Sequence, residues 1–163
     1  MCDLLKPPVP VYWRYDYSAT GVLTPIVEGE AWYREYVKRD PLLRITYVNC
    51  TSSNRILYVG SGNSKRPFAR HHRGIHSPPM SLFKPGEDFV IEVLAVTRWQ
   101  FLAKVLESLI CELAAPPLNK VRHILPTNRH LCERNLAVEF WNNNYASRFG
   151  IDAPYPYGAR GKV

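Results

Sequence analysis

Residues suited to binding and cleaving a phosphate ester occur in order along the middle of the chain. Two tyrosines lie at similar places in consecutive β-rich runs, Tyr47 in ITYV and Tyr58 in LYVG. Glycines follow the second run and lead into a cationic segment, which carries Lys65, Arg66, Arg70, His71, His72 and Arg73. Further along, Glu107 lies among apolar residues, and Asn119 follows in PPLN. Phosphodiester hydrolysis needs an activated water, a cation for the developing charge and help for the leaving oxygen, so this set has the required chemistry.

Each residue type suggests a role. A single carboxylate together with waters and phosphate oxygens suits Mg²⁺, or Mn²⁺, so Glu107 is the expected metal ligand. The planar guanidinium of Arg66 could hold the scissile phosphate, and Arg70 lies one helical turn later on the same face. His71 or His72 could shuttle a proton or donate to phosphate. We expect Lys65, Arg66, Arg70 and Arg73 to contact nucleic acid.

The ordered set resembles the GIY-YIG nuclease family over about residues 43–120. Tyr58-Val59-Gly60 is similar to the YIG half of the signature, and an arginine, a glutamate and an asparagine follow in the family's order, as Arg66, Glu107 and Asn119. The first half reads Ile45-Thr46-Tyr47 and lacks the leading glycine. The resemblance implies a metal-dependent DNA endonuclease. In that family's pattern Tyr47 acts as general base or orients the water, and Tyr58 supplies a second hydroxyl.

Structural explanations compete with these roles. The tyrosines could be half-buried strand aromatics, and the arginines could solvate a helix or touch only the DNA backbone. Glu107 could pair with Lys104, Glu112 is a rival metal ligand, and Asn119 could cap a turn. Whether Arg66 or Arg70 is the catalytic arginine stays open. The alternative function is a degenerate GIY-YIG fold that binds nucleic acid or a protein without cutting; a zinc-stabilised adaptor built on HHRGIH is a third interpretation.

Composition bounds these hypotheses. The 163 residues carry a net charge of +7, which favours a polyanionic partner, DNA first, with RNA not excluded. Four scattered cysteines without a CxxC pair predict reduced thiols. There is no apolar run of about 20 residues and no signal-peptide pattern at the start, so we expect an intracellular protein that is neither membrane-bound nor secreted. Cutting both strands with one site per chain would favour a homodimer or sequential nicking.

The elements that must position these residues can be located from periodicity and turn signals. We expect strands over 11–17, 22–27, 44–50, 55–59 and 89–96. Helices are expected over about 28–40, 64–74, 97–115, with a Thr97/Gln100 capping box, and 128–143. The predicted fold is α/β, of the α+β kind, in one domain over 1–163. A small three-stranded antiparallel sheet flanked by helices forms the core at 43–120. Residues 1–42 and 121–163 are expected to be extensions packed on that core.

Overall fold

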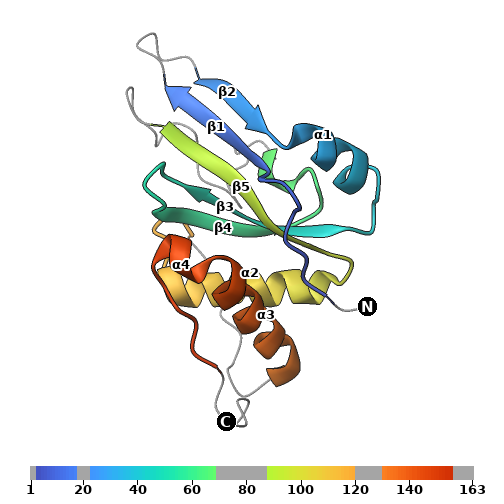
Figure 1. Ribbon diagram of the computed structural model, residues 1–163, viewed down its shortest axis with the longest axis vertical. Coiled ribbons are helices and arrows are strands. Elements are labelled where there is room, and N and C mark those ends of the chain that lie inside the picture. Colours follow the sequence, from blue (N-terminus) through green and yellow to red (C-terminus); the bar gives the residue numbers. More distant parts are fainter. Residues whose placement is uncertain (1–2, 18–22, 69–87, 120–129, 156–163) are drawn as a thin grey trace.

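A five-stranded antiparallel sheet is the centre of the computed structural model, which describes residues 3–17, 23–68, 88–119 and 130–155 (Figure 1). Its order is β2-β1-β5-β3-β4. The strands are β1 (Tyr12–Tyr17), β2 (Leu23–Glu28), β3 (Arg44–Cys50), β4 (Ile56–Gly62) and β5 (Asp88–Thr97). All five predicted strands are present within a mixed α and β fold, but the prediction of a three-stranded sheet is wrong.

The difference arises at β5, which lies in the middle of the sheet. One side of β5 pairs with β3, and the other side pairs with β1, from Tyr12 opposite Glu92 to Asp16 opposite Asp88. Residues 90–97 of β5 are buried on both faces of the sheet, as is typical of a central strand. The N-terminal hairpin therefore extends the sheet instead of packing against it as a separate layer.

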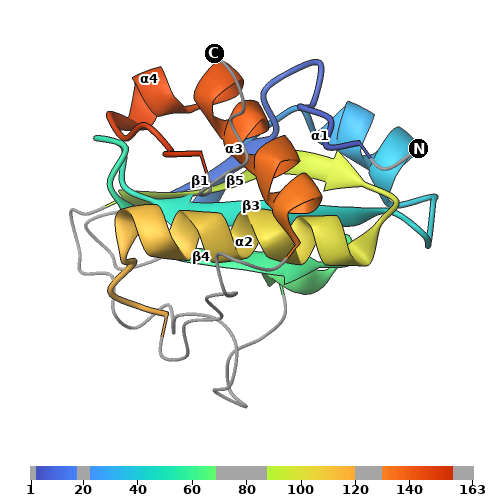
Figure 2. The same cartoon turned by 90° about the horizontal axis from the view of Figure 1, so that it is seen from below.

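Three helices cover one face of the sheet. These are α2 (Gln100–Ala114), α3 (Leu131–Asn144) and α4 (Ala146–Phe149), which Figures 1 and 2 show together on one side. Their apolar faces and the strands form one core cluster, which includes Val48, Val59, Leu94, Leu106 and Trp141. This core fixes α2 beneath β3 and β4.

The opposite face carries a second, more aromatic core. A short helix α1 (Glu30–Trp32) continues into a π-helical turn, η1 (Tyr33–Val37). Tyr33 from this turn packs edge-on against Trp13 of β1, with ring centroids 5.1 Å apart. Tyr47 and Tyr58 belong to the same cluster. The two predicted site tyrosines therefore lie on the face of the sheet away from α2.

The helices expected over 28–40, 97–115 and 128–143 are present with ends shifted by up to three residues, and the short helix α4 was not predicted. Thr97 is the last residue of β5, and its hydroxyl accepts the Trp99 N–H at 3.1 Å, so Trp99 is the N-cap of α2 and the predicted capping box is wrong. Of the helix expected at 64–74, the described part is a 3₁₀ turn, η2 (Arg66–Phe68). The rest of that prediction falls outside the described residues. In the described part of the chain, no helix is long and apolar enough to cross a membrane.

Candidate active site at the outer edge of strand β4

The outer edge of β4 is partly covered by the segment that follows α2. The Val59 N–H donates to the Asn119 side-chain oxygen at 3.0 Å, and the Asn119 amide donates back to the Val59 carbonyl at 2.9 Å. The Leu118 N–H donates to the Leu57 carbonyl at 3.0 Å. Leu118 and Asn119 therefore form hydrogen bonds to β4 much as a short neighbouring strand would. The two prolines at 116–117 end α2 and bring these residues to the edge. In an antiparallel strand every second residue directs its N–H and C=O groups to the same side, so the backbone groups of Ser61 lie on the same edge as those of Val59.

Glu107 lies beside this edge. It comes from the sheet-facing side of α2, is only 8% exposed, and accepts a hydrogen bond from the Ser61 hydroxyl at 3.2 Å. Ser61 faces α2 because it alternates with Gly60 along the strand. The rival carboxylate, Glu112, forms an ion pair with the buried Arg134 on α3. Of the two candidate metal ligands, Glu107 is thus the one next to β4.

Tyr47 and Tyr58 pack together on the opposite face of the sheet. Their ring centroids are 6.3 Å apart, and their exposed fractions are 0% and 6%. Tyr47 lies directly across from Gly60, and a Cβ atom on Gly60 would be 2.6 Å from the Tyr47 hydroxyl. The glycine of the YVG motif therefore has a steric function, because it leaves room for the Tyr47 ring.

Arg66 lies just beyond the end of β4, in a tight turn. Its backbone N–H donates to the Asn63 carbonyl at 3.0 Å, and the Lys65 N–H donates to the Asn63 side chain at 3.0 Å. The aliphatic part of Arg66 lies on Gly62, where an added Cβ would meet the Arg66 Cγ at 3.0 Å. Arg66 is partly exposed and Lys65 is exposed.

The structure brings some predicted site residues together and separates others. Asn119 bonds to the outer edge of β4, Glu107 contacts Ser61 on the face of β4 that α2 covers, and Arg66 follows the same strand. Tyr47 and Tyr58 belong to the other face. Four predicted residues lie outside the described part of the chain: Arg70, His71, His72 and Arg73. Sequence reasoning missed Ser61, whose only signal was its alternation with Gly60, and Tyr33, whose hydroxyl contacts the turn before Arg66.

The residues beside β4 can be compared with the needs of a hard divalent cation. Among the described residues no group of three or more His, Cys, Asp or Glu side chains could hold a metal. Mg²⁺ does not require such a cage, because it retains several waters and binds through one or two carboxylates plus phosphate oxygens. Glu107 supplies one such carboxylate, and the Ser61 hydroxyl that donates to it is a second oxygen group beside it.

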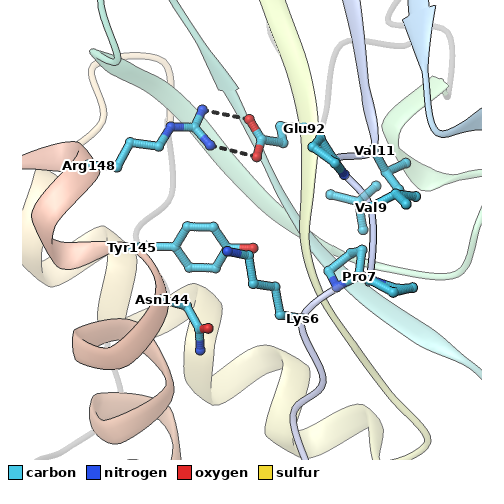
Figure 3. Close-up of a pocket in the computed structure, with 11 residues that line it drawn as sticks. Lys6, Pro7, Val9, Val11, Glu92, Asn144, Tyr145 and Arg148 are labelled. Carbon is cyan, nitrogen blue, oxygen red and sulfur yellow. Dashed lines mark hydrogen bonds and ion pairs between the residues drawn. The ribbon is translucent and has the colours of Figure 1, made fainter.

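A second feature is a pocket of about 200 Å³ between the N-terminal segment and α4 (Figure 3). Arg148 forms two hydrogen bonds to Glu92, at 2.6 and 2.7 Å, and a third to Asn54 at 3.1 Å. The Lys6 ammonium lies 5.3 Å from the centre of the Tyr145 ring. The Arg148–Glu92 pair joins α4 to β5, and the Lys6–Tyr145 contact holds the N-terminal segment beside them, so the polar groups that line this pocket have structural roles.

Comparison of the chain with protein-family profiles, with curated proteins and with solved structures gives no match.

Proposed function

We propose that the protein is a metal-dependent DNA endonuclease whose active site is the outer edge of β4. The observation that carries this proposal is the placement of Glu107: a nearly buried carboxylate is held by Ser61 against the strand that contains the YVG motif. Burial of a carboxylate costs free energy that hydrogen bonds must offset, and Glu107 accepts one from Ser61, so this buried acid beside β4 is a functional-site candidate. The net charge of +7 supports a polyanionic substrate.

The reaction adds water across a phosphodiester bond: the water oxygen bonds to phosphorus, the bond to the leaving oxygen breaks, and that oxygen takes up a proton. Glu107 and Ser61 would hold Mg²⁺ or Mn²⁺, which polarises phosphate oxygens and bound water when present. The guanidinium of Arg66, or of Arg70, binds the scissile phosphate and stabilises its developing charge. Asn119 fixes the β4 edge against which these groups are arranged.

The role of Tyr47 distinguishes the two candidate functions. A residue that orients water must reach it, whereas Tyr47 is 0% exposed and packs over Gly60. This burial favours the second candidate, a protein of related fold that binds nucleic acid without cutting it. The placement of Glu107 favours cutting, because a binder has no need of a carboxylate beside a phosphate.

The test uses supercoiled plasmid and a labelled single strand, incubated with the protein in Mg²⁺, Mn²⁺ or EDTA. Glu107→Gln keeps the size of the side chain and removes its charge, and Glu139→Gln is the matched control on the exposed side of α3. We expect metal-dependent cutting that falls at least about 100-fold in Glu107→Gln and is unchanged in Glu139→Gln. Equal cutting by Glu107→Gln would refute the metal assignment. Salt-sensitive binding without cutting in either metal would establish the second candidate.

A further inference from the structure

The N-terminal part of the chain reaches the proposed active site through Tyr33. The Tyr33 hydroxyl donates to the Ser64 carbonyl at 2.6 Å, across 31 positions of sequence. Ser64 lies in the turn that is closed by the Arg66 N–H and the Asn63 carbonyl, immediately before Lys65 and Arg66. A single hydrogen bond from a rigid element therefore fixes the turn that carries both cations.

The ring of Tyr33 is itself held firmly. It is 0% exposed and packs edge-on against Trp13 at 5.1 Å. The π-helical turn, closed by the Lys38 N–H and the Tyr33 carbonyl at 2.9 Å, buries Tyr33 and Val37 together. Single π-helical turns are rare and occur frequently at functional sites. Here the turn directs a phenol at the end of β4.

Tyr33 also lies near Tyr47. Burial raises the pKa of Tyr33 above its usual range, and the charge of Tyr47 raises it further. The raised pKa means that Tyr33 stays protonated at neutral pH, as a hydrogen-bond donor to Ser64 must.

We propose that Tyr33 is a positioning residue of the nuclease site: its hydroxyl clamps the Asn63–Arg66 turn and so holds Lys65 and Arg66 in register with Glu107 at the β4 edge. This inference rests on the proposed function. It makes the active site composite, with residues 30–37, outside the region that resembles GIY-YIG nucleases, supplying part of its support. Tyr33 touches neither substrate nor metal and acts through the turn.

The test compares Tyr33→Phe, which keeps the ring and removes the hydroxyl, with Tyr36→Phe, which removes an exposed hydroxyl from the same helical segment. In Tyr33→Phe we expect kcat for plasmid cutting to fall at least about 10-fold, since small misplacements of a catalytic group are costly. KM should change less than about two-fold, as when an interaction acts mainly in the transition state. Backbone amides of Lys65 and Arg66 should exchange hydrogen about 10-fold faster. Tyr36→Phe should match the wild type in all three.

The outcomes separate the two proposals. If the wild type cuts and Tyr33→Phe cuts equally well, or if kcat falls while exchange of the turn is unchanged, the clamp is refuted and the nuclease stands. If the wild type cuts in neither metal, the nuclease proposal fails together with the catalytic part of this inference. In that case, hydrogen exchange of the Lys65 and Arg66 amides alone tests whether the Tyr33 hydroxyl holds the turn.

Discussion

The contact between Gly60 and Tyr47 gives the sharpest prediction from the structure. A Cβ at Gly60 would lie 2.6, 2.7 and 2.9 Å from the hydroxyl, Cζ and Cε1 atoms of Tyr47, all closer than real Cβ atoms approach. The Tyr47 ring is fully buried and cannot swing into solvent. Gly60→Ala must therefore shift the ring or strand β4, at a cost of about 2 kcal/mol for overpacking a core. For a chain of this size we expect Tm to fall by roughly 4–8 °C.

The assay is reversible urea unfolding, with thermal unfolding in parallel. Tyr47→Phe removes the nearest clashing atom, so Gly60→Ala with Tyr47→Phe should cost less than the sum of the single changes. The control is Gly150→Ala, where φ is +71° and no atom lies within 4 Å of the added Cβ. That change should cost about 1 kcal/mol through backbone strain, without coupling to Tyr47. A Gly60→Ala protein within about 0.5 kcal/mol of the wild type would refute the packing argument.

Three further predictions concern the edge strand, the ion pair of the buried Glu92 and alkaline pH. Asn119→Ala removes both hydrogen bonds to Val59 and should lower the free energy of unfolding by about 1–3 kcal/mol. Asn143→Ala, on the exposed side of α3, should leave the free energy of unfolding unchanged. Equal effects of the two changes would exclude a special role for Asn119. Arg148→Met leaves the Glu92 carboxylate, 10% exposed, without its partner, and should cost up to about 3 kcal/mol by urea unfolding. Arg34→Met, which breaks an exposed pair with Glu30, should cost about 0.5 kcal/mol or less, and a similar loss in both would contradict the burial argument. Burial raises the pKa of Cys50 to about 12 and also raises the pKa of Tyr145 above its usual range, so the folded chain keeps protons that the unfolded chain releases. Stability from these groups is complete below about pH 9 and lost as the pH rises toward 12; unfolding free energies equal at pH 8 and pH 11 would show that the groups are not buried.

Local sequence patterns were sufficient to predict the five strands and the longer helices, but not the short helix α4. The β-branched runs became strands, the apolar spacing of α2 became a buried helix face, and the proline pair at 116–117 ended that helix. The cap of α2 was mispredicted because Thr97 remains in strand β5, where its hydroxyl bonds to the Trp99 N–H instead. Capping residues depend on where a strand stops, which short patterns locate poorly.

Local sequence patterns did not predict which strands pair when those strands are far apart in the sequence. Nothing in residues 11–28 specifies that β1 pairs with β5, because any exposed strand edge offers the same backbone groups. The number of strands in the sheet was therefore underestimated. The same limit applies to the site, since alternation along β4 separates Ser61 from Gly60 but does not say which face α2 covers.

The sequence by itself determined the residue types available for chemistry, the order of strands and helices, and the basic charge that favours a polyanionic partner. These are properties of composition and of neighbours within a few positions. Only the tertiary structure decided that Glu107 meets Ser61, that Asn119 holds the β4 edge, that Tyr47 needs Gly60, and that Tyr33 reaches Ser64. Each of these contacts joins segments between 13 and 60 positions apart. Such contacts depend on how the faces of the sheet are covered, and local sequence does not encode that.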